Sequence, residues 1–128
     1  MNAKKLAEYC VLEGFGVIGE DLFYSFIPES PDNCIAIFDT GGWAKDPDIP
    51  RKDKTYQFMV RGESYDSSRE MADKIFDYFC PDGIPKKDFY IGEFFIHQAL
   101  PTQAAPFHLG RDENDRDKFT INLTFIVD

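Results

Sequence analysis

The final segment of the chain alternates apolar and polar side chains without interruption. Apolar residues occupy every second position, at Phe119, Ile121, Leu123, Phe125 and Val127. A period of two places each set of side chains on one face of a strand, so the segment predicts a strand well inside a sheet. A second alternating stretch, Thr55 to Arg61, predicts another strand with one better-buried side.

Two apolar stretches further upstream predict a pair of strands. Leu22 to Ile27 is rich in aromatic residues, and Cys34 to Asp39 is almost wholly apolar at its start. The turn residues Pro31, Asp32 and Asn33 separate the two stretches, so we expect them to pair as a hairpin.

Three segments around the middle and end of the chain have less regular patterns. Thr40 to Lys54 shows no periodicity, and a structureless connection of about fifteen residues is typical of a functional loop. Phe89 to His97 is apolar and aromatic, which predicts one more long strand. Pro106 to Gly110 predicts a short strand, followed by a polar turn over Arg111 to Arg116.

Two segments have helical periodicity. Lys4 to Glu13 repeats apolar residues at helical spacing, and Gly14 is a natural stop. The second helix ends at Cys80, before Pro81, and it begins near Ser67, since Ser67 and Glu70 have the spacing of a capping box.

The strands are grouped along the chain and do not alternate with helices, which indicates an α+β fold. We expect a mixed, largely antiparallel sheet of about five to six strands, with the two helices packed on one face. The length of 128 residues fits one domain spanning residues 1–128.

The chain is acidic, with a formal net charge of −9. Such a surface repels phosphate, which argues against tight nucleic-acid binding and against anionic membranes. No stretch approaches the roughly 20 apolar residues of a membrane span. The three cysteines are odd in number and widely spaced, which indicates a reducing compartment and no disulfide framework.

Residues suited to catalysis or metal binding are sparse. The two histidines, His97 and His108, lie in aromatic or apolar contexts that favour structural roles, and no nucleophile signature is present. Asp112 and Asn114 resemble the start of a calcium loop, but Asp117 stands where that loop requires glycine. We expect no catalytic residue, no metal and no cofactor.

Aromatic residues are abundant, with 13 Phe and 6 Tyr in 128 residues. More large rings than one small core can hide imply a subunit interface. The single tryptophan, Trp43, follows two glycines in the long loop. It is expected either to pack on the core of its own chain or to insert into a partner, because tryptophan is enriched at binding hot spots.

Four segments carry a resemblance to a known family, and the first and last of them are more specific than the other two. They are SPDNCIAIFDTGG from Ser30, the strand from Tyr56 closed by Arg61-Gly62, the helix from Ser67 to Phe79, and FHLGRDEN from Phe107. In order and spacing they resemble a bacteriophage minor capsid protein family, which is similar in turn to the tail-terminator proteins of long-tailed phages. The resemblance covers most of the chain. The segment from Leu100 to Ala105 is longer than the family pattern, and Thr102 to Ala105 resembles an insertion.

This resemblance implies a structural virion component of a tailed phage or prophage. Such a protein is a minor capsid protein or tail terminator, placed at the head–tail junction or at the end of the tail tube. The resemblance further implies small α+β subunits that close into a hexameric ring around the DNA channel of the virion, beside other tail or connector proteins, while the free protein is either a monomer or already a ring. It implies no enzymatic activity and no cofactor, with synthesis in the bacterial cytoplasm before assembly into the virion.

A ring uses heterologous contacts, in which one patch meets a different patch on the neighbour. The candidate interface residues are Gly41, Gly42, Trp43, Asp46 and Arg51 in the long loop, together with Phe107, Leu109 and Arg111. We further expect the carboxylates of Asp112, Glu113 and Asp115 to line the bore, so that DNA slides through without adhering.

Two other functions remain open. An acidic DNA mimic would block a basic host partner, although here the acidic residues are interspersed with 14 Lys and Arg. A small enzyme would use a carboxylate in a sheet cleft, and Glu93 is the candidate for that role. Glu93 is instead expected to face solvent or to pair with Arg61 or Lys118.

Overall fold

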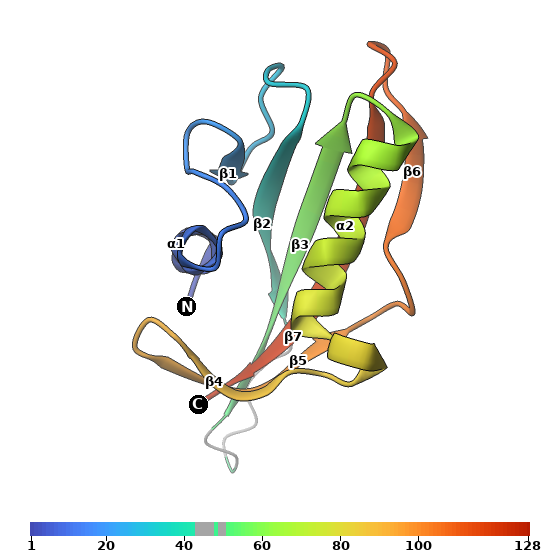
Figure 1. The fold of residues 1–128 in the computed structure, drawn as a ribbon. Helices are drawn as coiled ribbons and strands as arrows, with labels where there is room; N and C mark the ends of the chain where they lie inside the picture. Colours follow the sequence, from blue (N-terminus) through green and yellow to red (C-terminus); the bar gives the residue numbers. More distant parts are fainter. Residues whose placement is uncertain (43–47, 49–50) are drawn as a thin grey trace.

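A computed structural model describes residues 1–42, 48 and 51–128 (Figure 1). The two α-helices and seven strands of these residues are α1 (Ala3–Leu12), β1 (Leu22–Tyr24), β2 (Cys34–Gly42), β3 (Lys52–Gly62), α2 (Tyr65–Phe79), β4 (Lys87–Ile91), β5 (Phe94–Pro101), β6 (Phe107–Arg111) and β7 (Asp117–Val127). A short 3-10 turn, η1 (Pro81–Gly83), follows α2.

The strands form one curled sheet in the order β1-β2-β3-β7-β5-β4, with β6 also paired to β7 (Figure 1). Strand β1 is parallel to β2, and every other pairing is antiparallel. The predicted α+β class and largely antiparallel sheet are therefore confirmed. The sheet has seven strands, where about five to six were expected.

The additional strand comes from the aromatic stretch, which is two strands and not one. Strands β4 and β5 form a hairpin in which Ile91 pairs with Phe94. Gly92 has a positive φ of 60°, which glycine adopts without steric cost in a tight turn. The prediction of a single strand from Phe89 to His97 was wrong because the aromatic residues continue across this turn.

The expected hairpin between the first two strands was also wrong. Strand β1 is only three residues long and pairs with β2 in parallel, with Leu22 opposite Ile35. Ser25, with φ of 73°, follows directly after β1. Residues 25–33 then return the chain to the end at which β1 began, so β2 runs in the same direction as β1.

The long central loop is shorter than predicted. Strand β2 continues to Gly42 and β3 begins at Lys52, and the two pair directly as far as Gly42 opposite Lys54. Residues 40–42 and 52–54 of the predicted loop thus lie in strands. Trp43 and Asp46 lie outside the described residues.

Both helices lie on one face of the sheet, as predicted (Figure 1). Helix α1 packs against β1 and β2, and α2 packs against β3 and β7. One buried cluster joins them to the inward side chains of the central strands, among them Leu6, Ile75, Phe79, Ile37, Phe58, Val60, Ile121 and Phe125. The alternation in the last segment therefore marks the core side of β7.

Helix α2 begins three residues earlier than predicted. Ser64 caps the helix by accepting a hydrogen bond from the Ser67 backbone N–H at 3.1 Å, and Ser67 Oγ lies 3.2 Å from the Ser64 backbone N–H, which donates to it. The expected pair of Ser67 and Glu70 was wrong because Ser64 offers the same spacing one turn earlier.

Strands β5 and β6 share one edge of β7. Pro101 pairs with Leu123 and Phe107 with Thr120, which leaves two residues of β7 opposite the connection 102–106. The side chain of Gln103 fills this gap. Its Oε1 accepts from the Asn122 backbone N–H at 3.1 Å, and its Nε2 donates to the Thr120 carbonyl at 2.8 Å. The segment flagged as an insertion is thus a bulge bridged by a side-chain amide.

Candidate assembly surfaces

The outer side of β6, here called the β6 edge, is an exposed margin of the sheet. Phe107 and Leu109 expose 60% and 47% of their surface. Among the described strands, β6 pairs only with β7. Sheet edges are commonly protected by charged side chains. The β6 edge instead presents two large apolar side chains, with Arg111 at its end.

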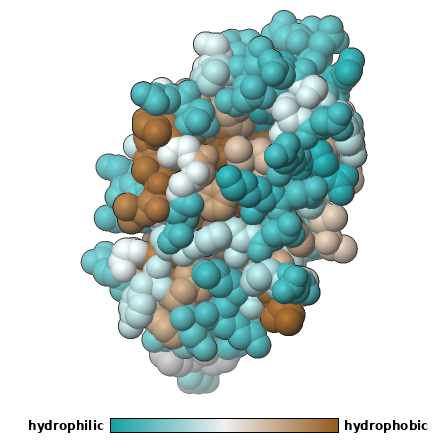
Figure 2. All heavy atoms as spheres, viewed as in Figure 1, coloured by the Kyte–Doolittle hydropathy of each residue, from teal (hydrophilic) through white to brown (hydrophobic). Residues whose placement is uncertain are grey.

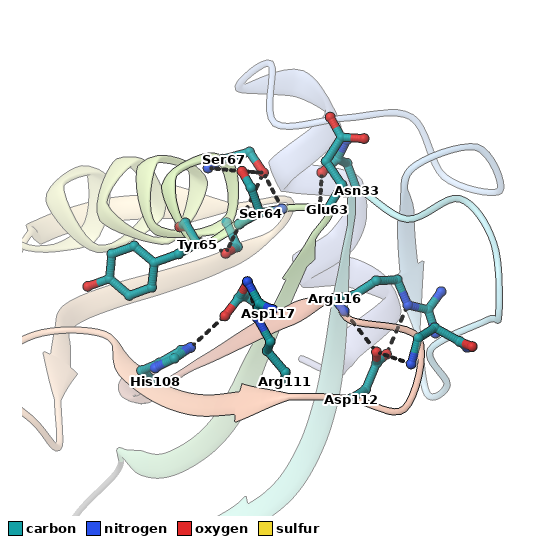
Figure 3. A network of polar contacts seen from close by, with 12 residues as sticks. Asn33, Glu63, Ser64, Tyr65, Ser67, His108, Arg111, Asp112, Arg116 and Asp117 are labelled. Carbon is teal, nitrogen blue, oxygen red and sulfur yellow. Dashed lines mark hydrogen bonds and ion pairs between the residues drawn. The ribbon is translucent and has the colours of Figure 1, made fainter.

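His108 lies between these two apolar residues and points to the helix side of the sheet (Figure 3). Its Nε2 is 3.0 Å from Oδ1 of the buried Asp117, and its ring packs edge-on against Tyr65. Arg111 Nε lies 3.6 Å from Oδ2 of the same carboxylate. His108 therefore anchors β6 to β7 and to α2, as the structural interpretation of this histidine anticipated.

The polar turn after β6 is organised by Asp112 (Figure 3). The Asp112 carboxylate accepts hydrogen bonds from the backbone N–H groups of Asn114 and Arg116 and from Arg116 Nε at 2.9 Å. These hydrogen bonds hold the pKa of Asp112 below its usual value of 3.8. The bond from the Arg116 backbone N–H has the largest effect. Asp112 thus serves the turn itself, whereas Glu113 and Asp115 are exposed.

Two buried arginines bind the segment before β2, Arg116 from this turn and Arg61 from β3. Arg116 donates to the Glu29 carbonyl and lies 3.4 Å from Asp32 Oδ1. Arg61 donates to the Pro31 carbonyl at 2.7 Å and to the Asp32 carbonyl at 3.3 Å. The two most distinctive segments of the sequence therefore lie side by side. Sequence reasoning named Arg61 as the end of a strand and Arg116 as the end of a polar turn, but it did not predict that either is buried, because nothing local distinguishes them from solvated charges.

Two positions in the described part of the β2–β3 hairpin require glycine. Gly41 and Gly42 have φ of 93° and 121°, a region that other residues rarely adopt. A Cβ atom on Gly42 would lie 2.2 Å from the Asp53 carbonyl oxygen. Gly41, Gly42 and Arg51 are all exposed.

The opposite margin of the sheet carries a second exposed aromatic group, which sequence reasoning did not single out. We call it the β1 edge, formed by β1 and Phe26. Phe26 is 56% exposed, and its ring centroid lies 5.6 Å from that of Phe23. Phe23 belongs to a small cluster with Ala36, apart from the main core and therefore on the helix-free face.

A hollow of about 310 Å³ opens beside α2 and the connector from α1 to β1. Its lining includes Phe15, Ile35 and Met71 together with charged groups. Of its four charged lining residues, Asp21 accepts from the Val17 backbone N–H at 2.7 Å and Arg61 donates to backbone carbonyls, so these two serve the framework. Figure 2 shows apolar side chains gathered at the left of this face, near α1 and that connector.

Other candidate chemistry is dispersed over the described residues. Glu93 is exposed at the β4–β5 turn, which agrees with the solvent-facing alternative. His97 lies 3.1 Å from Asp128 at the end of the sheet. Within residues 1–42, 48 and 51–128, His, Cys, Asp and Glu side chains form no group of three suited to a metal. No helix in this part of the chain is long and apolar enough to cross a membrane.

The fold is that of a small α+β subunit, with arginines fixing the framework inside and aromatic groups displayed at the β6 and β1 edges. A family model described as bacteriophage tail terminator protein matches residues 12–128. The chain therefore belongs to the bacteriophage tail terminator family, a family of structural proteins. No curated protein matches the sequence.

Proposed function

We propose that this protein is a tail terminator that assembles into a homo-oligomeric ring, a hexamer, at the end of the tail tube where the tail meets the head. The observation that carries the proposal is the family match, which spans residues 12–128. The displayed aromatic groups at two different margins support self-association, because a ring needs two unlike patches on each copy.

The protein acts without catalysis and without a cofactor in this proposal. Each histidine is bound to a carboxylate, His97 to Asp128 and His108 to Asp117. All three cysteines are buried, and burial raises the pKa of the Cys10 thiol to about 12. These groups are therefore poorly placed to act on a substrate.

In this proposal, carboxylates line the bore of the ring. The proteins that contact the ring are other tail or connector proteins. Glu113 and Asp115 are the residues whose carboxylates are free to face DNA, since Asp112 is bound by Arg116. An acidic lining disfavours the counterion release that drives DNA adhesion.

The experiment that tests the function deletes the gene from its phage or prophage and examines the particles. We expect mature virions to contain the protein by mass spectrometry, and deletion to give tails of uncontrolled length that fail to join heads in electron micrographs. Complementation with the intact gene should restore tail length. Tails of normal length and normal joining in the deletion strain would refute the proposal.

A further inference from the structure

The strand register brings the β6 edge and the β1 edge to the same level. One row of cross-strand partners runs over β1, β2, β3, β7 and β6, through Phe23, Ala36, Met59, Thr120 and Phe107. Residues of one row lie on one face of a sheet. Phe23 and Phe107 therefore stand at opposite ends of the same row, on the same face.

That face is the helix-free one. The neighbouring row, which contains Leu22, Ile35 and Phe119, lies in the main core under the helices. Phe26 extends the aromatic surface at the β1 edge by packing on Phe23, and Leu109 accompanies Phe107 at the β6 edge. Each margin thus displays large apolar side chains toward the same side of the molecule.

The charges at the two margins are complementary. Arg111 ends β6 with its side chain 63% exposed. Glu20 and Asp21 directly precede β1 and are exposed. On the strand ladder, Arg111 pairs with Asp117 at the end of the sheet from which β1 starts. A copy placed beside another with the sheets in line brings this cation toward these acids.

The β1 edge is suited to side-chain contact and not to extension of the backbone ladder. The Leu22 N–H donates to the Val17 carbonyl at 3.2 Å, and the Leu22 carbonyl accepts from Gly19 N–H at 3.0 Å. These bonds occupy the outer backbone groups of Leu22. A neighbour at this margin therefore meets aromatic rings and carboxylates.

We propose that the β6 edge of one copy docks on the β1 edge of a second copy, with Phe107 and Leu109 packed on Phe26 and with Arg111 facing Glu20. This inference rests on the proposed ring and names the surfaces that form its subunit contact. Because the two patches differ, the contact is heterologous and repeats from copy to copy until the ring closes. Buried aromatic anchors and a partnered arginine are typical of such hot spots.

Cysteine cross-linking tests the contact with two variants, Phe26→Cys and Phe107→Cys, at exposed positions where folding is little affected. Within one chain the two positions lie at opposite margins of five strands, roughly 19 Å apart at about 4.8 Å per strand. A disulfide needs Cα atoms within about 7 Å. Any disulfide between these positions therefore joins two chains.

We expect each single variant to remain uncross-linked after mild oxidation, and a 1:1 mixture of the two to give one covalent dimer. The double variant should give a ladder of species that ends at the number of subunits in the ring. Tyr90→Cys, on the exposed aromatic of β4, is the control and should not cross-link with Phe26→Cys. The native cysteines are buried and should not contribute.

A charge exchange gives an independent readout. Arg111→Glu and Glu20→Arg should each weaken assembly when alone, as measured by mass photometry. Their mixture should recover it, since alternating copies restore opposite charges at every contact. Matched controls are Lys87→Glu and Glu8→Arg, which reverse exposed charges elsewhere.

Dimers of Phe107→Cys with itself, or no cross-link in the mixture, would overturn the proposed contact. Rings seen by electron microscopy without the mixed cross-link would leave the tail-terminator function intact and reject only these surfaces. The proposed function is tested separately, by whether the deletion strain loses control of tail length.

Discussion

At the scale of single residues, the fold depends on side chains that complete the backbone hydrogen bonding. Gln103 supplies an amide where the β7 ladder has no strand opposite it, and Arg61 and Arg116 bind the carbonyls of the segment before β2. Buried backbone groups left without partners are costly. These three residues therefore fix loops that lack regular structure.

Replacing Gln103 tests this role. Gln103→Ala removes the partners of the Asn122 N–H and the Thr120 carbonyl, and we expect the free energy of unfolding to fall by about 1–3 kcal/mol. Urea denaturation measures the change. Gln98→Ala, at a half-buried position on β5, is the matched control and should lower the free energy of unfolding by a smaller amount. Equal losses in the two variants would contradict the proposed bridge.

The sequence could not reveal these side-chain roles. Arg116 binds Glu29 and Asp32, which are more than eighty residues away along the chain. The acidic turn was interpreted as three equivalent carboxylates, yet the hydrogen bonds that the turn offers to Asp112 separate it from Glu113 and Asp115. Composition records how many charges are present, whereas their pairing is set by tertiary contacts.

At the scale of elements, periodicity located helices and core strands well. The alternation from Phe119 to Val127 marks the core side of β7, and the predicted helix Lys4 to Glu13 lies one residue from α1. Pairing was harder, since the direction of β1 relative to β2 depends on the path of residues 25–33. The β4–β5 turn at Gly92 was hidden because aromatic residues flank it on both sides.

The start of α2 provides a prediction at this scale. A Cβ atom at Gly62 would lie 2.8 Å from Ser68 Cβ and 2.9 Å from Ser68 N. Gly62→Ala should therefore displace the first turn of the helix and lower the free energy of unfolding by about 1–3 kcal/mol. Thermal unfolding followed by circular dichroism measures the effect. Glu63→Ala, on the next and exposed residue, should change little, and an unaltered Gly62→Ala protein would refute the close packing.

At the scale of the whole molecule, the acidic surface and the two margins have separate roles in our proposal. The margins carry the contact between copies, and the carboxylates of Glu113 and Asp115 face the bore. The family and the α+β fold were accessible from the sequence because the segments that define them are local. The proposed contact between the β6 edge and the β1 edge was not accessible from the sequence, since it depends on the register of five strands.

The bore hypothesis predicts how assembled rings bind DNA. Glu113→Gln combined with Asp115→Asn should raise the affinity for double-stranded DNA at about 0.01 M salt, where charges act over about 30 Å. The gain should fade near 0.15 M salt, where the range is about 8 Å. Fluorescence anisotropy measures the binding. The control combines Glu8→Gln with Asp77→Asn, two exposed helix positions of the same charge. Equal gains in DNA affinity for the two double variants would contradict the hypothesis.

The amide bridge at Gln103 separates the length of the 102–106 connection from the alignment of β5 and β6 on β7. Residues 104 and 105 are exposed and lie beyond that bridge. Chain added there extends into solvent without sliding either strand. The position is therefore one where the chain can be lengthened, for example by a short label, without changing the register of either strand.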